Sequence, residues 1–167
     1  MAQRVFGIVG WKNSGKTTLT ERLVALLSAR GYRVATVKHA HHAFDIDHPG
    51  TDSHRHRQAG AREVAIVSGR RWALMHELAD EPEPSLGDIL VRLSPCDLVL
   101  VEGYKSGPHP KIEVRRREAR DHKSLAADAN ILAIASDHAV DDTDLPVFDL
   151  DDIAAIAAFI VDQIRLT

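Results

Sequence analysis

The sequence predicts an α/β fold built around a mostly parallel central sheet. Short apolar runs rich in β-branched residues alternate with stretches whose leucines and isoleucines recur at helical spacing. Strands that alternate with helices are typical of parallel sheets, because each crossover between parallel strands needs a long connection. The chain has 167 residues, without an internal repeat or a low-complexity linker, which favours one domain over residues 1–167.

The first forty residues show this alternation most clearly. Residues 4–10 form an apolar run that predicts a buried strand. Leucines at helical spacing after it predict a helix that ends near Gly31. Residues 32–39 predict a second strand, and the polar stretch over 39–52 that follows predicts a long loop.

The middle of the chain is expected to add two helices and a pair of strands. Residues 53–61 predict a short helix, for which Ser53 is a suitable N-cap. Residues 63–69 and 71–77 predict two strands around a Gly-containing turn. Residues 86–93 predict another helix after a proline-containing connection.

The last third is expected to complete the sheet. Residues 97–103 and 130–136 predict buried strands, whereas residues 110–116 alternate apolar and polar side chains, as a half-exposed strand does. Residues 151–164 predict a closing amphipathic helix. Because α/β sheets bind ligands at the carboxyl ends of their strands, the residues that follow each strand are candidates for a binding site.

The segment between the first strand and the first helix carries the strongest functional signal. Residues 10–17, "GWKNSGKT", match the phosphate-loop pattern G-x-x-x-x-G-K-[ST]. Glycines let backbone N–H groups point inward at phosphate oxygens, and the helix that follows adds the positive end of its dipole. The motif refines the expected fold to a three-layer P-loop NTPase type, with helices on both faces of the sheet. The expected nucleotide-binding residues are Gly10, Asn13, Ser14, Gly15, Lys16, Thr17 and Thr18.

A magnesium ion is expected beside the bound phosphates. Lys16 is predicted to reach the β- and γ-phosphates as a binding and catalytic cation, and the Thr17 hydroxyl is predicted to ligate Mg²⁺. Glu102 ends a predicted strand, at the edge that faces the ligand, so it is the preferred second acid of the magnesium shell. Asp97 begins that strand and is expected at the opposite edge. Asp137 follows another strand and is a candidate reader of guanine, with a turn-capping role as the equal alternative.

Residues 37–61 are unusually rich in histidine and aspartate. Three interpretations remain open: a metal site, a polar loop, or a nucleotide switch whose acids act on magnesium and the attacking water. The histidines are His39, His41, His42, His48, His54 and His56. The acids are Asp45, Asp47 and Asp52.

The phosphate loop, "KHAHHAFDIDHPGTDS", "RQAGA", "RWALMHE" and "DLVLVEGYK", in this order, resemble the MobB family of molybdopterin-guanine dinucleotide biosynthesis adaptor proteins. The resemblance implies a homodimeric GTP-binding protein with weak GTPase activity and GTP and Mg²⁺ as cofactors. It also implies a role beside the guanylyltransferase that joins GMP to molybdopterin, with that enzyme and molybdopterin as partners. It makes Asp47 and Asp52 the candidate catalytic acids. Family members often carry lysine where Thr51 stands in this chain.

Composition excludes some functions and leaves others open. The net charge of −3 argues against a general nucleic-acid binder or membrane-surface protein. A single cysteine, Cys96, excludes an intrachain disulfide, and without an apolar segment of transmembrane length we expect a cytoplasmic protein. A small-molecule kinase and a metal-insertion GTPase that uses the histidine-rich loop remain alternatives. Trp72 and Met75 are interpreted as core or dimer contacts.

Overall fold

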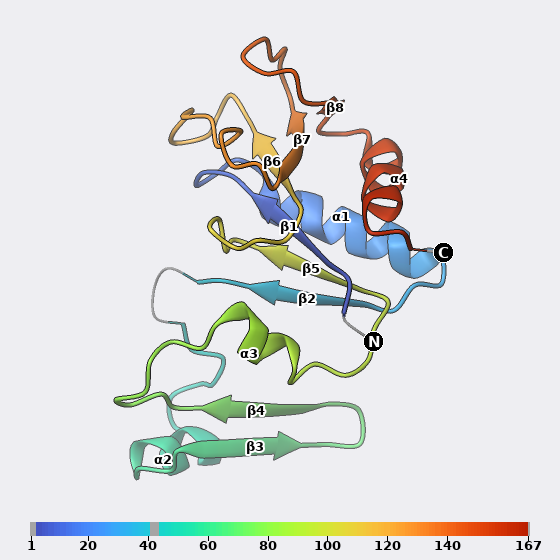
Figure 1. Cartoon of the computed structure of the whole chain (residues 1–167). Helices are drawn as coiled ribbons and strands as arrows, with labels where there is room; N and C mark the ends of the chain where they lie inside the picture. Colours follow the sequence, from blue (N-terminus) through green and yellow to red (C-terminus); the bar gives the residue numbers. More distant parts are fainter. Residues whose placement is uncertain (1–2, 41–43, 167) are drawn as a thin grey trace. The chain divides into compact units, whose positions relative to one another are not determined.

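The chain forms two compact units (Figure 1). A computed structural model describes residues 3–40 and 44–166. The first unit comprises Met1–His39 and Asp88–Thr167, and the second comprises Ala40–Gly87. We expected one nucleotide-binding domain over residues 1–167 and found no signal in the sequence for a second unit.

The first unit is built on a parallel sheet. Among the described residues, six strands form this sheet, and every neighbouring pair is parallel. The strand that precedes the phosphate loop is central and pairs on both sides. The order is β2 (Val34–Lys38), β5 (Leu98–Glu102), β1 (Val5–Val9), β6 (Lys111–Arg115), β7 (Ile131–Ser136) and β8 (Val147–Asp149).

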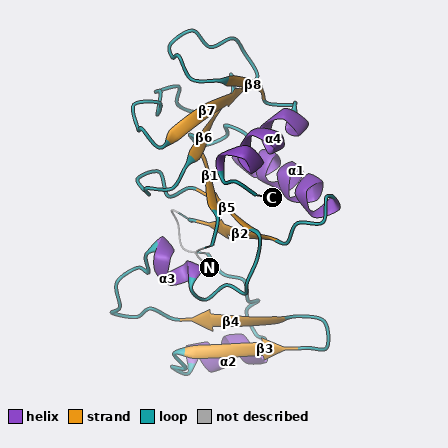
Figure 2. Cartoon of the chain, turned by 45° about the vertical axis from the view of Figure 1, so that its right-hand side comes forward, coloured by secondary structure: helices purple, strands orange, loops and turns teal. Residues whose placement is uncertain are grey.

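Two helices, α1 (Lys16–Ala29) and α4 (Ile153–Gln163), pack against each other beside this sheet. Leu23 of α1 and Ile160 of α4 are completely buried in one apolar cluster with strand residues such as Phe6. The predicted α/β class with a parallel sheet is confirmed. Figures 1 and 2 show both helices on the same side of the sheet, whereas we expected helices on both faces.

Loops cover part of the opposite face. Lys111 and Glu113 of β6 point away from the apolar cluster, yet they are 0% and 1% exposed. The Lys111 ammonium lies 2.8 Å from the Asp128 carboxylate, and the Glu113 carboxylate accepts a hydrogen bond from the Leu125 backbone N–H at 3.0 Å. The prediction of a half-exposed strand over this segment is therefore wrong. Its polar side chains are buried, and each interacts with a residue of the loop that follows the strand.

The second unit consists of an antiparallel hairpin and a short helix. The hairpin strands are β3 (Glu63–Val67) and β4 (Trp72–His76), and the helix is α2 (Asp52–Gln58). Thr51 is the N-cap of α2, because its side chain accepts the His54 backbone N–H; the Ser53 cap that we predicted is wrong by two residues.

A second short helix, α3 (Leu86–Leu90), spans the boundary between the two units in the sequence. In the described part of the chain, no helix combines the length and the apolar character needed to cross a lipid bilayer.

Candidate functional site

The loop between β1 and α1 takes a backbone path that depends on its glycines. Gly10, Asn13 and Gly15 have positive φ angles of 152°, 65° and 91°. A Cβ atom at Gly10 would lie 2.5 Å from the Val114 carbonyl oxygen, which is closer than a side chain can approach. Asparagine tolerates the left-handed conformation better than most residues do. The motif therefore has the close backbone approach and the left-handed turns that a phosphate cradle needs.

The first turn of α1 offers its backbone N–H groups to an anion. Its N-cap, Gly15, provides no side-chain cap, and the first turn contains no acidic residue. Uncapped N–H groups at a helix N-terminus attract phosphate oxygens. A cavity of about 410 Å³ lies over this turn. It is lined by Asn13, Ser14, Gly15, Lys16, Thr17, Thr18, Arg116 and Glu118. Six of the seven predicted nucleotide-binding residues thus share one cavity.

Lys16 lies folded back over the loop. Its ammonium donates a hydrogen bond to the Trp11 carbonyl oxygen at 2.6 Å. Burial lowers the pKa of Lys16; the nearby Glu102 opposes this effect, and the positive charges of Lys105 and Lys38 add to it. Three lysines therefore bring positive charge to the phosphate loop.

Thr17 and Glu102 meet although 85 residues separate them in the sequence. The Thr17 hydroxyl lies 3.1 Å and 3.2 Å from the two carboxylate oxygens of Glu102. The Lys38 ammonium lies 3.6 Å from one of these oxygens. The contact follows from strand order, because β1 and β5 are parallel neighbours whose carboxyl ends share one edge.

Asp97 lies at the other end of β5, as expected. Its carboxylate pairs with Arg33, with 2.9 Å between the closest guanidinium nitrogen and oxygen. The hydrogen bond from the Arg33 side chain, together with one from the Arg33 backbone, lowers the pKa of Asp97 to about 2. Asp97 therefore links the start of β5 to the start of β2. It lies at the opposite end of the strand from the phosphate loop.

The carboxylate of Asp137, the candidate residue for guanine recognition, already interacts with other residues of the chain. One carboxylate oxygen accepts the Arg117 backbone N–H at 3.0 Å and lies 2.8 Å from the His138 ring. The other lies 3.7 Å from Arg116. Burial would raise the pKa of Asp137, but the hydrogen bonds from His138 and Arg117 outweigh burial and lower it. Its contacts are those of a turn-organising residue, and its role in reading guanine stays a prediction.

Lys105 and Trp11 form a contact that the sequence analysis did not identify. The Lys105 ammonium lies 3.6 Å from the centroid of the indole ring, within the range of a cation–π interaction. The indole N–H donates to the Lys123 carbonyl oxygen at 2.6 Å. Lys38 and Lys105 both lie at or just beyond carboxyl ends of adjacent strands, and that position was the signal that could have identified them.

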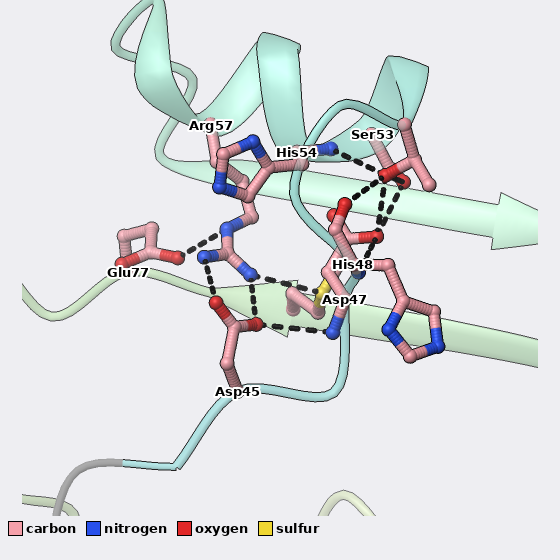
Figure 3. Close-up of polar contacts among 9 residues, drawn as sticks. Asp45, Asp47, His48, Ser53, His54, Arg57 and Glu77 are labelled. Carbon is pink, nitrogen blue, oxygen red and sulfur yellow. Dashed lines mark hydrogen bonds and ion pairs between the residues drawn. The ribbon is translucent and has the colours of Figure 1, made fainter.

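In the second unit, Arg57 connects two acids (Figure 3). Its two terminal nitrogens lie 2.7 Å and 3.1 Å from the two oxygens of Asp45. Its Nε atom lies 2.9 Å from Glu77. The Arg57 hydrogen bond lowers the pKa of Asp45 well below its usual range. Asp45 is thus bound into a structural ion-pair network.

Asp47 organises the segment before α2. One of its oxygens accepts hydrogen bonds from the Thr51 hydroxyl at 2.8 Å, the Ser53 hydroxyl at 3.0 Å and the His48 backbone N–H at 3.1 Å (Figure 3). Its other oxygen is buried and has no hydrogen-bond partner among the described residues. Asp52 is the first residue of α2. Both acids belong to the second unit, and their catalytic role stays a prediction.

The histidine-rich segment was also considered as a metal site. Among the described residues, no group of three or more histidine, cysteine, aspartate and glutamate side chains has the arrangement of a metal centre. His41 and His42, two of the predicted candidates, lie outside the described residues.

Comparison with known proteins places this geometry in a family. The family model described as "Molybdopterin guanine dinucleotide synthesis protein B" matches residues 5–137, a span that includes the phosphate loop and Glu102. The chain belongs to the MobB family. The resemblance noted in the sequence is confirmed, and the match extends across both units.

Individual MobB relatives agree with this assignment. The molybdopterin-guanine dinucleotide biosynthesis adapter protein of Escherichia coli is 39% identical over 96% of this chain and 93% of its own length. The adapter protein of Haemophilus influenzae is 40% identical over 93% of this chain and 86% of its own length. The crystal structure of a MobB homologue from Bacillus stearothermophilus matches with a TM-score of 0.74 at 34% identity, over 98% of this chain and 99% of that one.

Proposed function

We propose that this MobB-family chain binds GTP with Mg²⁺ at its phosphate loop and acts as an adapter in molybdopterin-guanine dinucleotide biosynthesis. The observation that carries the nucleotide proposal is the contact of the Thr17 hydroxyl with both oxygens of Glu102. Hydroxyl and carboxylate oxygens are ligands that Mg²⁺ prefers. Their meeting at the mouth of the cradle fits a hydrated Mg²⁺ between the protein and the phosphates.

The phosphate-binding roles follow from the chain's own groups. The uncapped N–H groups of α1 face the phosphates, and the Lys16 ammonium leaves the Trp11 carbonyl oxygen to pair with them. Bound Mg²⁺ would neutralise the β- and γ-phosphates. Asp47 and Asp52 are the acids assigned to hydrolysis. We propose that hydrolysis is slow, because one Asp47 carboxylate oxygen is already occupied by hydrogen bonds from the Thr51 and Ser53 hydroxyls.

The adapter part of the proposal rests on the relatives. Two proteins that are 39% and 40% identical are named adapter proteins of molybdopterin-guanine dinucleotide biosynthesis. We propose the same role for this chain, beside the guanylyltransferase that joins GMP to molybdopterin. In that role the bound GTP would be presented to the partner enzyme, and molybdopterin would be the second small molecule of the complex.

A second copy of the chain is proposed as a further partner. The hairpin face that carries Val67, Trp72 and Leu74 is apolar, and these side chains are exposed by 76%, 68% and 51%. Cross-strand pairing puts them on one face, because Val67 pairs with Trp72 and Ala65 with Leu74. The opposite face contains Met75, which is buried. An exposed apolar patch on a hairpin is typical of an interface.

The nucleotide proposal is tested by calorimetric titration of GTP with increasing Mg²⁺. Lys16→Ala is expected to abolish GTP binding while the melting temperature stays within a few degrees. Glu102→Gln is expected to remove the Mg²⁺ dependence, and Glu21→Gln, on the exposed side of α1, serves as the matched control. GTP affinity in Lys16→Ala equal to that of the parent would refute the proposed site.

A further inference from the structure

We infer that a second cavity beside the phosphate loop binds a 2-amino-4-oxopyrimidine ring, the ring edge shared by guanine and pterins. The inference rests on the proposed function, because it names the part of a ligand that this region of the first unit recognises. The cavity has a volume of about 350 Å³, which is within the range of small-molecule sites.

The cavity adjoins the phosphate cradle. It lies beyond the carboxyl ends of β6 and β7, where α/β sheets bind ligands. Arg116 lines both this cavity and the phosphate-loop cavity, and Trp11, the second residue of the loop, lines this one. A ligand whose phosphates lie on the loop can therefore extend its ring into the neighbouring cavity.

One wall of the cavity is held in place by interactions on two sides. The Trp11 indole is fixed at its N–H by the Lys123 carbonyl oxygen and above its ring by the Lys105 ammonium. The Arg115 guanidinium, which also lines the cavity, is paired with Glu113 at 3.0 Å and with Asp142 at 2.5 Å. These contacts maintain the shape of the cavity, so little ordering is needed when a flat ring enters.

Asp141 is the acid of this cavity that remains available. Glu113 and Asp142 pair with Arg115, and Asp121 accepts the Lys123 backbone N–H. Asp141 lines the cavity, is exposed, and makes no hydrogen bond or ion pair with another described residue. A carboxylate can accept two parallel N–H groups in a fork.

A 2-amino-4-oxopyrimidine ring presents such a fork. Its ring N–H and its amino group lie side by side, and the Asp141 carboxylate can accept both. Adenine has a ring acceptor at the matching position, so the same carboxylate would face a lone pair and reject it. Arg116 and Lys123, which also line the cavity, supply donors for the 4-oxo group. The lining thus complements the guanine-type edge better than the adenine-type edge.

Two ligands carry this edge: the guanine of GTP and a pterin. The test uses Asp141→Asn, with Asp144→Asn as a matched control, since Asp144 is exposed and does not line this cavity. Both changes are made in a Trp72→Phe background, which leaves Trp11 as the sole tryptophan. Trp11 emission and calorimetry are followed on titration with GTP, ATP and pterin-6-carboxylic acid.

Each outcome decides one question. If guanine occupies the cavity, Asp141→Asn lowers GTP affinity about 10-fold or more and leaves ATP affinity unchanged. If a pterin occupies it, pterin affinity falls by a similar factor, and both nucleotides bind as in the parent. Unchanged affinity for all three ligands in a folded Asp141→Asn protein overturns the inference. Failure of the parent to bind either nucleotide would instead overturn the proposed function, and the pterin titration would still test the cavity.

Discussion

The ammonium of Lys111 is completely buried and lies 2.8 Å from the carboxylate of Asp128, which is 17 residues further along the chain. The same ammonium donates to the Gly107 carbonyl oxygen. The hydrogen bond from Lys111 is the largest cause that lowers the pKa of Asp128, to about 2; two from Asn130 add to it. This pair joins β6 to the loop that covers the face of the sheet opposite α1 and α4. Strand β6 is the direct neighbour of β1, the strand that precedes the phosphate loop.

Asp128→Asn should destabilise the protein by roughly 3 kcal/mol at neutral pH, because it leaves a buried ammonium without its carboxylate. The folded pKa lies below the unfolded value of 3.8, so the stabilisation is fully present above about pH 5 and is lost as pH falls towards 2. Urea unfolding of parent and variant from neutral pH to pH 2 measures this difference. A gap that stays constant down to pH 2, or an equal loss in Asp144→Asn, would contradict the assignment.

Gly10→Ala should damage the phosphate loop far more than Gly31→Ala. Both glycines have positive φ angles, of 152° and 90°, so both substitutions incur backbone strain of about 1 kcal/mol or more. Only at Gly10 would the new Cβ meet backbone, 2.5 Å from the Val114 carbonyl oxygen; at Gly31 nothing lies within 4 Å. Thermal melts and GTP titration separate the two effects. Equal GTP affinity in both variants would show that the close approach at Gly10 is unimportant.

The second unit should lose stability as pH rises above 6.5 and through the raised pKa of His76. His76 lies 2.8 Å from Glu63 and 3.1 Å from Glu81, and these hydrogen bonds raise its pKa above 6.5. A raised folded pKa means that the stabilisation is fully present below pH 6.5 and is lost as pH rises through the folded value. His76→Gln should flatten this dependence. Trp72 emission in a Trp11→Phe background follows the unfolding, and parallel pH profiles for the two proteins would disprove the role of His76.

Trp72→Glu should shift the proposed dimer towards monomer by at least about 10-fold in dissociation constant. The change removes a large apolar side chain and brings two like charges together across a symmetric contact. Val91→Glu is the control, because Val91 is 83% exposed and lies outside the hairpin. Sedimentation velocity over a range of concentrations measures the equilibrium. A parent protein that stays monomeric, or equal shifts in both variants, would argue against the hairpin as the interface.

Much of the phosphate-binding half of the site could be predicted from sequence. The loop lies between an apolar run and a leucine pattern, and the observed β1 and α1 agree closely with those limits. Glu102 was identified because it ends a buried strand, and it contacts Thr17 in the structure. These inferences depend on local signals: hydrophobic period, glycine spacing, and the direction in which parallel strands present their ends.

Other residues near the site were not accessible to this reasoning. Arg116 lines both cavities, yet in sequence it belongs to a basic run that resembles an ordinary solvated surface. Strand β8 has only three residues and was missed, because such a short segment has no readable period. The resemblance to the MobB family made Asp47 a candidate catalytic acid, whereas its hydrogen bonds with Thr51 and Ser53 become visible only when the loop is folded.

By itself, the sequence determined the phosphate loop, the alternation of strands and helices, and the placing of Glu102 at a strand end. Each of these depends on residues that are close together in the chain. Only the tertiary structure decided that α1 and α4 share one face, that Lys111 is buried, and that residues 40–87 form a separate unit. Those features depend on packing and ion pairs between distant segments, and the local pattern of a sequence does not specify which distant partners meet.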